Sequence, residues 1–366
     1  MTQNNIQNQF QYLIAIKPLG LLYGSFGSFL SPENLVGRSS QKFPPDATTL
    51  SGVYAAHYGE GSEELKNLQL AGSFWAKEDD LQNWYFPTPF NCLVKRDRIQ
   101  HLLVWHEEEE KWRPPTGSKI PEDEKFNQNS WISLDTWQEL SQFKGKLPEL
   151  KVITKDPWET LPQLHPQLRK GERRAVFDQE TQRGKLFLEN SIQLEPDVNL
   201  IYLSSIELPN GWYRFGGEGH FVEISSHKLK SETLNLLNAS LGRSFALISS
   251  GVWGTNRFSY REPMVLNSDS HSEPEKVWDV QACMTKRPKV FRYRLGKKKK
   301  TDETDTKSHS PRLLSRGRYA VPAGSVYVVK EPLNAWQQWD LNWFPQEGYS
   351  FKRWGCGLAL PLNCVE

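Results

Sequence analysis

Short alternating or apolar runs, separated by turns rich in glycine, proline and charged residues, recur along most of this sequence. Runs of this kind predict β-strands. The order strand, helix, strands, glycine-rich loop and strand occurs twice, with helical spacing at 48–58 and again at 230–241. At 366 residues the chain is long enough for two domains. We therefore predict an α+β fold made of two similar halves.

The predicted boundary between the halves lies at residue 228. The first domain, 1–228, includes a polar insertion near 106–170 that carries a short helix near 134–143. The second domain, 229–366, has its first strand at 245–248 and a lysine-rich loop insertion near 296–312.

Large aromatic side chains dominate the apolar content. The sequence has 14 Trp, 18 Phe and 12 Tyr, although only 37% of its residues are hydrophobic. Disordered chains are poor in aromatic residues, so we predict a folded protein with a core of large rings. No run of about 18 apolar residues is present, and the polar first residues do not resemble a signal peptide. We expect a cytoplasmic protein.

The cysteines and histidines do not suggest a metal site. Cys92, Cys283, Cys356 and Cys364 are too few for a disulfide framework in a chain of this length. They form no C-x-x-C pair, and no two histidines have the spacing of metal ligands. We expect buried free thiols, no metal and no cofactor.

Catalytic motifs are also missing from the sequence. It contains no G-x-S-x-G, H-E-x-x-H or P-loop pattern. His220, beside a glycine cluster, and His57, on the predicted first helix, are candidates for the general base of a metal-independent ribonuclease. Ordinary packing also explains both residues, and His220 has the further option of contacting a nucleotide. We predict that the protein is not an enzyme.

The net charge of +2 conceals an uneven distribution. Residues 286–318 contain 13 Lys and Arg against three acids, so this segment carries +10 and the rest of the chain −8. Such asymmetry directs one surface towards a polyanion, whereas a solvated loop is the simpler explanation for the polar stretch 297–310.

Basic and aromatic residues alternate next to glycine-rich turns, at 213–215, 292–294, 318–319 and 351–354. In RNA-binding proteins cations hold phosphates while rings stack on bases. A half-buried strand with basic residues outward and rings inward gives the same alternation. The pattern leaves both interpretations open.

Gly216-Gly217-Glu218-Gly219 is the densest glycine cluster. Glycine allows positive φ and the close approach of a neighbour or ligand. The spacing differs from the dinucleotide fingerprint. The cluster predicts either a tight β-turn or a loop that approaches a ligand.

Three segments, in this order, resemble elements of CRISPR-associated RAMP proteins. Residues 43–52 are similar to the "P-P-x-x-T-L-x-G" helix start of these proteins. Residues 214–219 resemble the "G-G-E-G" element, and 319–327 the "A-V-P-A-G-S-V-Y" strand, of the third subunit of the Cmr (type III-B) interference complex. Weaker similarities lie at 177–181 and 355–359.

This resemblance implies two ferredoxin-like (RRM-like) domains in a non-catalytic subunit of a type III-B RNA-guided antiviral complex. The subunit would bind the repeat-derived 5′ tag of crRNA and bridge the large cyclase/polymerase-type subunit to the backbone RAMP subunits. The sequence departs from the family at 23–29, which lacks the usual Arg-Asp-Gly-Arg-like stretch. Arg38 or Lys42 are possible substitutes for its basic contact.

The predicted RNA contacts combine backbone amides of glycines, which approach phosphates, with cations that offset the phosphate charge. They are Lys17, Arg38, Lys42, Arg214, Gly216, Gly217, Gly219, His220, Arg318, Lys352 and Arg353. The alternatives are a metal-independent RAMP endoribonuclease that processes precursor crRNA, and a scaffold that touches only protein.

Overall fold

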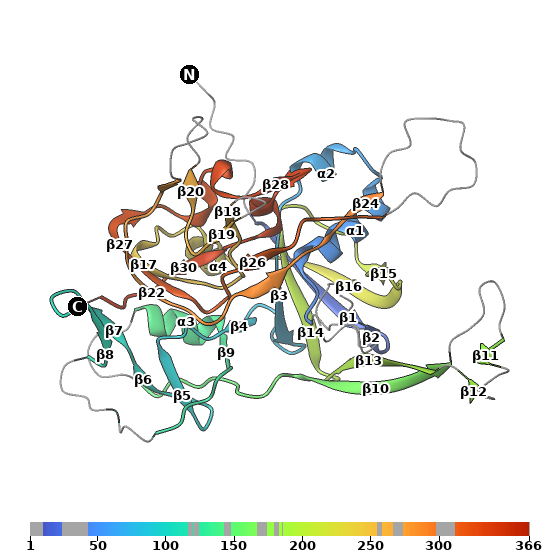
Figure 1. Ribbon diagram of the computed structural model, residues 1–366, viewed down its shortest axis with the longest axis horizontal. Coiled ribbons are helices and arrows are strands. Elements are labelled where there is room, and N and C mark those ends of the chain that lie inside the picture. Colours follow the sequence, from blue (N-terminus) through green and yellow to red (C-terminus); the bar gives the residue numbers. More distant parts are fainter. Residues whose placement is uncertain are drawn as a thin grey trace.

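The computed structural model describes residues 10–23, 43–115, 120, 124–142, 148–166, 174–178, 183–184, 186–254, 258–265, 274–297 and 312–365. Within them the chain forms two main sheets with few helices, and neighbouring strands of both sheets run antiparallel (Figure 1). The predicted α+β class is confirmed.

The larger sheet has seven strands in the order β15-β16-β1-β14-β3-β4-β9. Every residue of β14 is buried, as expected for a strand covered on both faces. The strands are β1 (Tyr12–Pro18), β3 (Leu70–Lys77), β4 (Tyr85–Pro87), β9 (Trp131–Ser133), β14 (Val198–Ser204), β15 (Gly211–Phe215) and β16 (His220–Lys228).

Helix α1 (Ala47–Tyr58) covers one face of this sheet. It ends at Gly59, which has φ +86° and donates its N–H to the carbonyl of Ala55. Leu50 and Tyr54 pack on apolar residues of the sheet. The buried Tyr54 hydroxyl donates to the Ile206 carbonyl at 2.7 Å, so its polar atom keeps a partner.

The second half of the chain covers the opposite face. Its four-stranded sheet has the order β22-β27-β17-β30. One continuous cluster of buried side chains joins Leu13 and Phe74 of the larger sheet to Phe245 and Trp278 of the second half. The predicted core of large rings is thereby confirmed. The strands are β17 (Gly242–Leu247), β22 (Val280–Met284), β27 (Val326–Leu333) and β30 (Ala359–Pro361).

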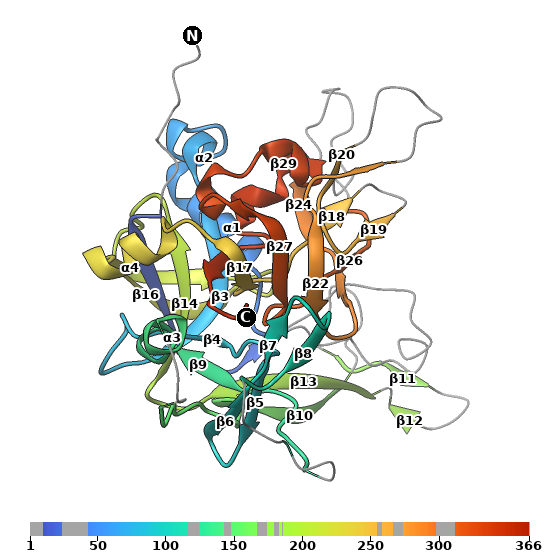
Figure 2. The same cartoon turned by 90° about the vertical axis from the view of Figure 1, so that its left-hand side faces the viewer.

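Several small elements surround the two sheets, and the long ribbon β10–β13 extends away from them (Figures 1 and 2). The helices are α2 (Glu63–Asn67), α3 (Leu134–Ser141), α4 (Ser231–Leu237), η2 (Trp336–Gln338), η3 (Leu341–Trp343) and η4 (Phe351–Trp354). A three-stranded sheet consists of β10 (Trp158–Pro166), β13 (Leu186–Leu194) and β2 (Leu22–Tyr23). In the first half of the chain the two-stranded pairs are β5 (Cys92–Lys95) with β6 (Arg98–Leu102), β7 (Val104–His106) with β8 (Lys111–Arg113), and β11 (Phe177–Asp178) with β12 (Arg183–Gly184). In the second half they are β18 (Trp253–Gly254) with β19 (Ser259–Tyr260), β20 (Met264–Val265) with β21 (Glu275–Lys276), β23 (Lys289–Phe291) with β26 (Arg318–Ala320), β24 (Arg294–Lys297) with β25 (Arg312–Leu314), and β28 (Gln346–Glu347) with β29 (Tyr349–Ser350).

The short helix predicted near 134–143 in the insertion is α3, whereas the strands β9 and β10 in the same insertion were not predicted, and β9 pairs with the larger sheet. The two strands were missed because they are three residues long or end in proline. Of the lysine-rich loop predicted near 296–312, residues 298–311 lie outside the described residues, and the ends of the loop belong to the paired strands β24 and β25.

All four cysteines are free, and three of them are buried. Burial raises the pKa of the Cys356 and Cys364 thiols to about 12, so both are protonated at neutral pH. In the described part of the chain, no group of three or more His, Cys, Asp or Glu could hold a metal ion. None of the described helices is long and apolar enough to cross a membrane.

Candidate nucleic-acid interface

The hairpin β15–β16 presents two different faces. Tyr213 and Val222, which pair across its strands, pack with the cluster under α1. The next pair, Arg214 and Phe221, points to the other side, as does Trp212, because side chains alternate along a strand. We call Trp212, Arg214 and Phe221 the open face of the hairpin.

The open face combines rings with a cation. Trp212 is 76% exposed and Phe221 57% exposed, which is unusual for large apolar side chains. The guanidinium carbon of Arg214 lies 4.9 Å from the centroid of the Phe221 ring. Its charge remains at the surface while the ring orients it. This arrangement suits a ligand that carries both planar groups and negative charge.

The glycine cluster forms the turn that joins the two strands. The N–H of Gly219 donates to the carbonyl of Gly216 at 3.2 Å, and the two residues have φ values of +69° and +74°. The β-turn interpretation is correct, and it explains both glycines. A Cβ at Gly219 would lie 3.5 Å from Nη1 of Arg214, so the turn leaves space for that side chain. Gly217 is exposed at the tip.

Lys17 lies on the same side of the sheet as the open face. It pairs in register with Glu223 of β16, and its Nζ lies 2.7 Å from Oε1 of Glu78. The two side chains of this ion pair are 38% and 52% exposed, so it contributes only about 0–1 kcal/mol. A stronger anion can displace Glu78.

The two histidines occupy other positions. His220 begins β16 on the α1 side and is half-buried. The His57 ring contacts Tyr58 and Tyr213 edge-on, with centroid distances of 4.7 Å and 6.0 Å. Aromatic packing therefore accounts for His57.

The family of the chain follows from its sequence profile. Residues 31–364 match the profile of the CRISPR-associated protein family Cas_Cmr3. The chain belongs to the Cas_Cmr3 family. No curated protein matches it significantly.

Several solved structures have similar chain traces. A chain of the structure entitled "Cryo-EM structure of the Type III-B Cmr-beta bound to cognate target RNA" is 13% identical, with 86% of each chain covered and a TM-score of 0.43. A chain of a Csm3-Csm4 subcomplex from the type III-A CRISPR-Cas interference complex is 13% identical, covering 96% and 99%, with a TM-score of 0.38. One from a Csm1-Csm4 cassette in complex with AMPPNP is 11% identical, covering 97% and 99%, with a TM-score of 0.36.

The remaining predicted contacts of this Cas_Cmr3 chain are placed differently. Arg318 is buried, forms an ion pair with Glu347, and lies 5.0 Å from the centre of the Phe351 ring. The Arg318 guanidinium therefore lies inside the second half of the chain, where its contacts are with other parts of the protein. The exposed residue of this segment is the neighbouring Tyr319.

Lys352 is also buried. Its Nζ donates to the carbonyls of Gln337, at 2.9 Å, and Trp339. Burial lowers the pKa of the Lys352 ammonium from 10.5 to about 8. The side chain holds η2 in place from within.

Arg353 is half-buried and spans two parts of the chain. Its guanidinium carbon lies 3.8 Å from the centroid of the Tyr349 ring, and Nη1 donates to the Lys66 carbonyl of α2 at 3.3 Å. Burial lowers its pKa. Arg38 and Lys42 lie outside the described residues.

The structure thus brings Lys17, Arg214 and the glycine turn together at one edge of the larger sheet. It adds Trp212 and Phe221, which were not among the predicted residues. Their signal was available in the sequence, because both flank the glycine cluster at positions that alternate with buried apolar residues.

Proposed function

We propose that this protein is a non-catalytic subunit of a type III-B CRISPR effector complex and binds the repeat-derived 5′ tag of crRNA. The observation that carries the proposal is the open face of β15–β16, where two exposed rings flank a surface arginine. Single-stranded RNA offers unstacked bases to such rings and phosphates to such a cation.

The strand order supports the proposal of two ferredoxin-like domains, 1–228 and 229–366. In the larger sheet, β16-β1-β14-β3 are the fourth, first, third and second of these strands along the chain. In the smaller sheet, β30-β17-β27-β22 follow the same order. RRM domains of this kind bind RNA through rings on the sheet surface.

The open face lies on the side of the sheet that α1 leaves uncovered. The second half of the chain covers the centre of that side, around Leu13 and Ala15, and leaves the β15 edge accessible. An RNA strand on the open face therefore meets protein along one flank and the glycine turn, with its exposed Gly217, at the other.

We further propose that the chain bridges the large cyclase/polymerase-type subunit and the backbone RAMP subunits. Strand β15 ends the larger sheet and β22 ends the smaller one, with no further strand paired outside them among the described residues. Such edges can accept a strand from another chain.

The test compares the affinity of assembled complexes for crRNA with its own tag and with a scrambled tag. The double variant Trp212→Ala with Phe221→Ala should bind the tagged guide at least about tenfold more weakly, because each stacked base contributes about 1–3 kcal/mol. The matched control removes a similarly exposed ring from the second half, Phe258→Ala. Its affinity should equal that of the unmodified protein.

Three outcomes contradict the proposal. Equal affinity for guides with the native and the scrambled tag would show that the tag is not the ligand. Unchanged binding of the tagged guide by the double variant would favour a scaffold that contacts only protein. Cleavage of repeat RNA in EDTA that is lost in His220→Ala or His57→Ala would establish the endoribonuclease instead.

A further inference from the structure

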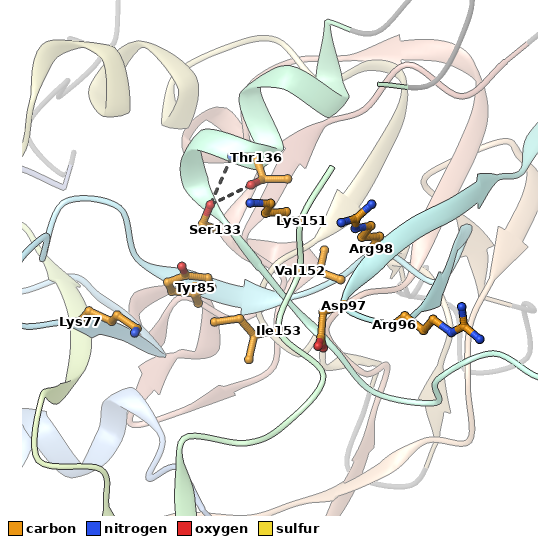
Figure 3. A pocket seen from close by; sticks show the side chains of 10 residues that line it. All are labelled: Lys77, Tyr85, Arg96, Asp97, Arg98, Ser133, Thr136, Lys151, Val152 and Ile153. Atoms are coloured by element: carbon orange, nitrogen blue, oxygen red, sulfur yellow. Dashed lines mark hydrogen bonds between the residues drawn. The ribbon is translucent and has the colours of Figure 1, made fainter. Parts of the chain in front are cut away.

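A groove of about 440 Å³ lies between the β5–β6 hairpin and the start of α3, and none of the three residues of the open face lines it (Figure 3). Four basic residues line it: Lys77, Arg96, Arg98 and Lys151. Tyr85 and Ser133 also contribute. Lys77 and Tyr85 lie at one end and Arg96 at the other, with Lys151 and Arg98 between them.

Two of these cations are placed directly opposite each other. Arg98 and Lys151 form an antiparallel bridge, next to a hydrogen bond from the Ile99 N–H to the Leu150 carbonyl at 3.0 Å. Like charges at facing positions of paired strands destabilise the pairing. The ion pair of Arg98 with Glu149 offsets only part of this repulsion, since its partners are 52% and 59% exposed.

The turn of the hairpin is also unfavourable. Arg96 and Asp97 both have positive φ, at +52° and +57°. Turns of this kind prefer Asn-Gly or Asp-Gly, because side chains other than these resist left-handed φ. The turn is held by its surroundings. The Thr154 N–H donates to Oδ1 of Asp97 at 3.2 Å, and the Val152 N–H donates to the Asp97 carbonyl at 3.0 Å.

Residues that are unfavourable for local stability, when several of them lie at one groove, indicate a functional site there. Asp97 also lines the groove, where its carboxylate accepts hydrogen bonds from Thr154, and the three cations Arg96, Arg98 and Lys151 outnumber it. At the opposite end, burial and then the negative charges of Asp79, Asp80 and Asp135 raise the pKa of the Tyr85 hydroxyl. The Arg96 end of the groove therefore carries an excess of positive charge. At the Tyr85 end these aspartates outnumber Lys77, whose Nζ lies 3.8 Å from Oδ2 of Asp197.

We propose that this groove binds a nucleotide, with its phosphate held by Arg96, Arg98 and Lys151. Guanidinium groups match phosphate oxygens in geometry and charge. The volume suits one small ligand. The hydroxyls of Ser133 and Thr136, 3.0 Å apart, and the acidic end favour a partner that presents hydroxyl and amino donors, as a nucleoside does. The site is independent of the open face and of the tag.

The variant Arg96→Gly separates function from stability. Glycine adopts positive φ without strain, so this change removes a ligand and relaxes the turn. Calorimetric titration with ATP, a short single-stranded RNA and inorganic phosphate should show about tenfold weaker nucleotide or RNA binding by this variant. Its thermal unfolding midpoint should equal or exceed that of the unmodified protein. The ATP and RNA arms distinguish a free nucleotide from one within a strand.

Two controls make the result specific. Arg113→Gln with Lys330→Gln removes two exposed cations elsewhere and should leave binding unchanged. RNA binding is measured in the Trp212→Ala, Phe221→Ala background, so that loss of the open face is not mistaken for loss of the groove. Absence of binding by ATP and RNA, equal binding by Arg96→Gly, or phosphate alone binding as tightly as the nucleotides would overturn the proposal.

Discussion

Replacing Arg318 by alanine tests whether this arginine supports the fold or contacts RNA. Its side chain is 2% exposed, and that of its partner Glu347 is 13% exposed. The truncation leaves the Glu347 carboxylate buried, with the Arg316 N–H as a remaining donor at 3.0 Å. Breaking a buried ion pair on one side costs about 3–5 kcal/mol. That is a large share of the roughly 5–15 kcal/mol that stabilises a folded domain.

Urea unfolding followed by tryptophan fluorescence measures this loss. We expect Arg318→Ala to lower the free energy of unfolding by about 3–5 kcal/mol. Arg287→Ala, an exposed arginine of the same basic segment, should change it by less than about 0.5 kcal/mol. Arg318→Met with Glu347→Leu removes both charges and should restore most of the stability. Unchanged stability together with lost RNA binding in Arg318→Ala would refute the assignment.

Two further predictions concern the same half of the chain. Between pH 8 and 10.5 Lys352 keeps its proton in the unfolded chain but has lost it in the folded protein, so folding becomes more favourable as the pH rises. The unfolding free energy of the wild type minus that of Lys352→Met should therefore rise by about 2–3 kcal/mol over this range. A difference that does not change with pH would contradict the lowered pKa. Gly355→Ala should destabilise the protein by more than Gly59→Ala, as unfolding midpoints would show. Both have positive φ, but only a Cβ at Gly355 would overlap Ala71; equal midpoints would contradict this.

Short apolar runs and period-two alternation were sufficient to predict most strands of the two sheets, because each strand buries one or both of its faces. Residues 290–294 and 316–321 both alternate with period two, and within them Lys289–Phe291 pairs with Arg318–Ala320 as the β23–β26 ribbon. Strand partners were harder. The segment 175–188 suggests a single hairpin, but among the described residues only Phe177–Asp178 and Arg183–Gly184 pair with each other there, and Leu186–Leu194 pairs instead with Trp158–Pro166. The strand Trp158–Pro166 contains Pro162 and ends in Pro166, and prolines within a run argue against a strand.

The sequence did not show which basic side chains point to the surface and which are buried. In β15 the arginine points outward and the tyrosine inward, whereas in β26 Arg318 is buried and Tyr319 is exposed. The difference arises from Glu347, which lies far along the chain and offers Arg318 a partner inside the second half. Lys352 is likewise buried because two distant carbonyls accept its hydrogen bonds.

The central claim, that the open face binds the 5′ tag, is tested most directly by photocrosslinking. A guide RNA with thiouridine in its tag is assembled into the complex, irradiated, and the crosslinked peptides are identified by mass spectrometry. We expect crosslinks within the β15–β16 hairpin, at Trp212, Arg214 or Phe221. Crosslinks confined to other parts of this chain, or to other subunits, would contradict the claim.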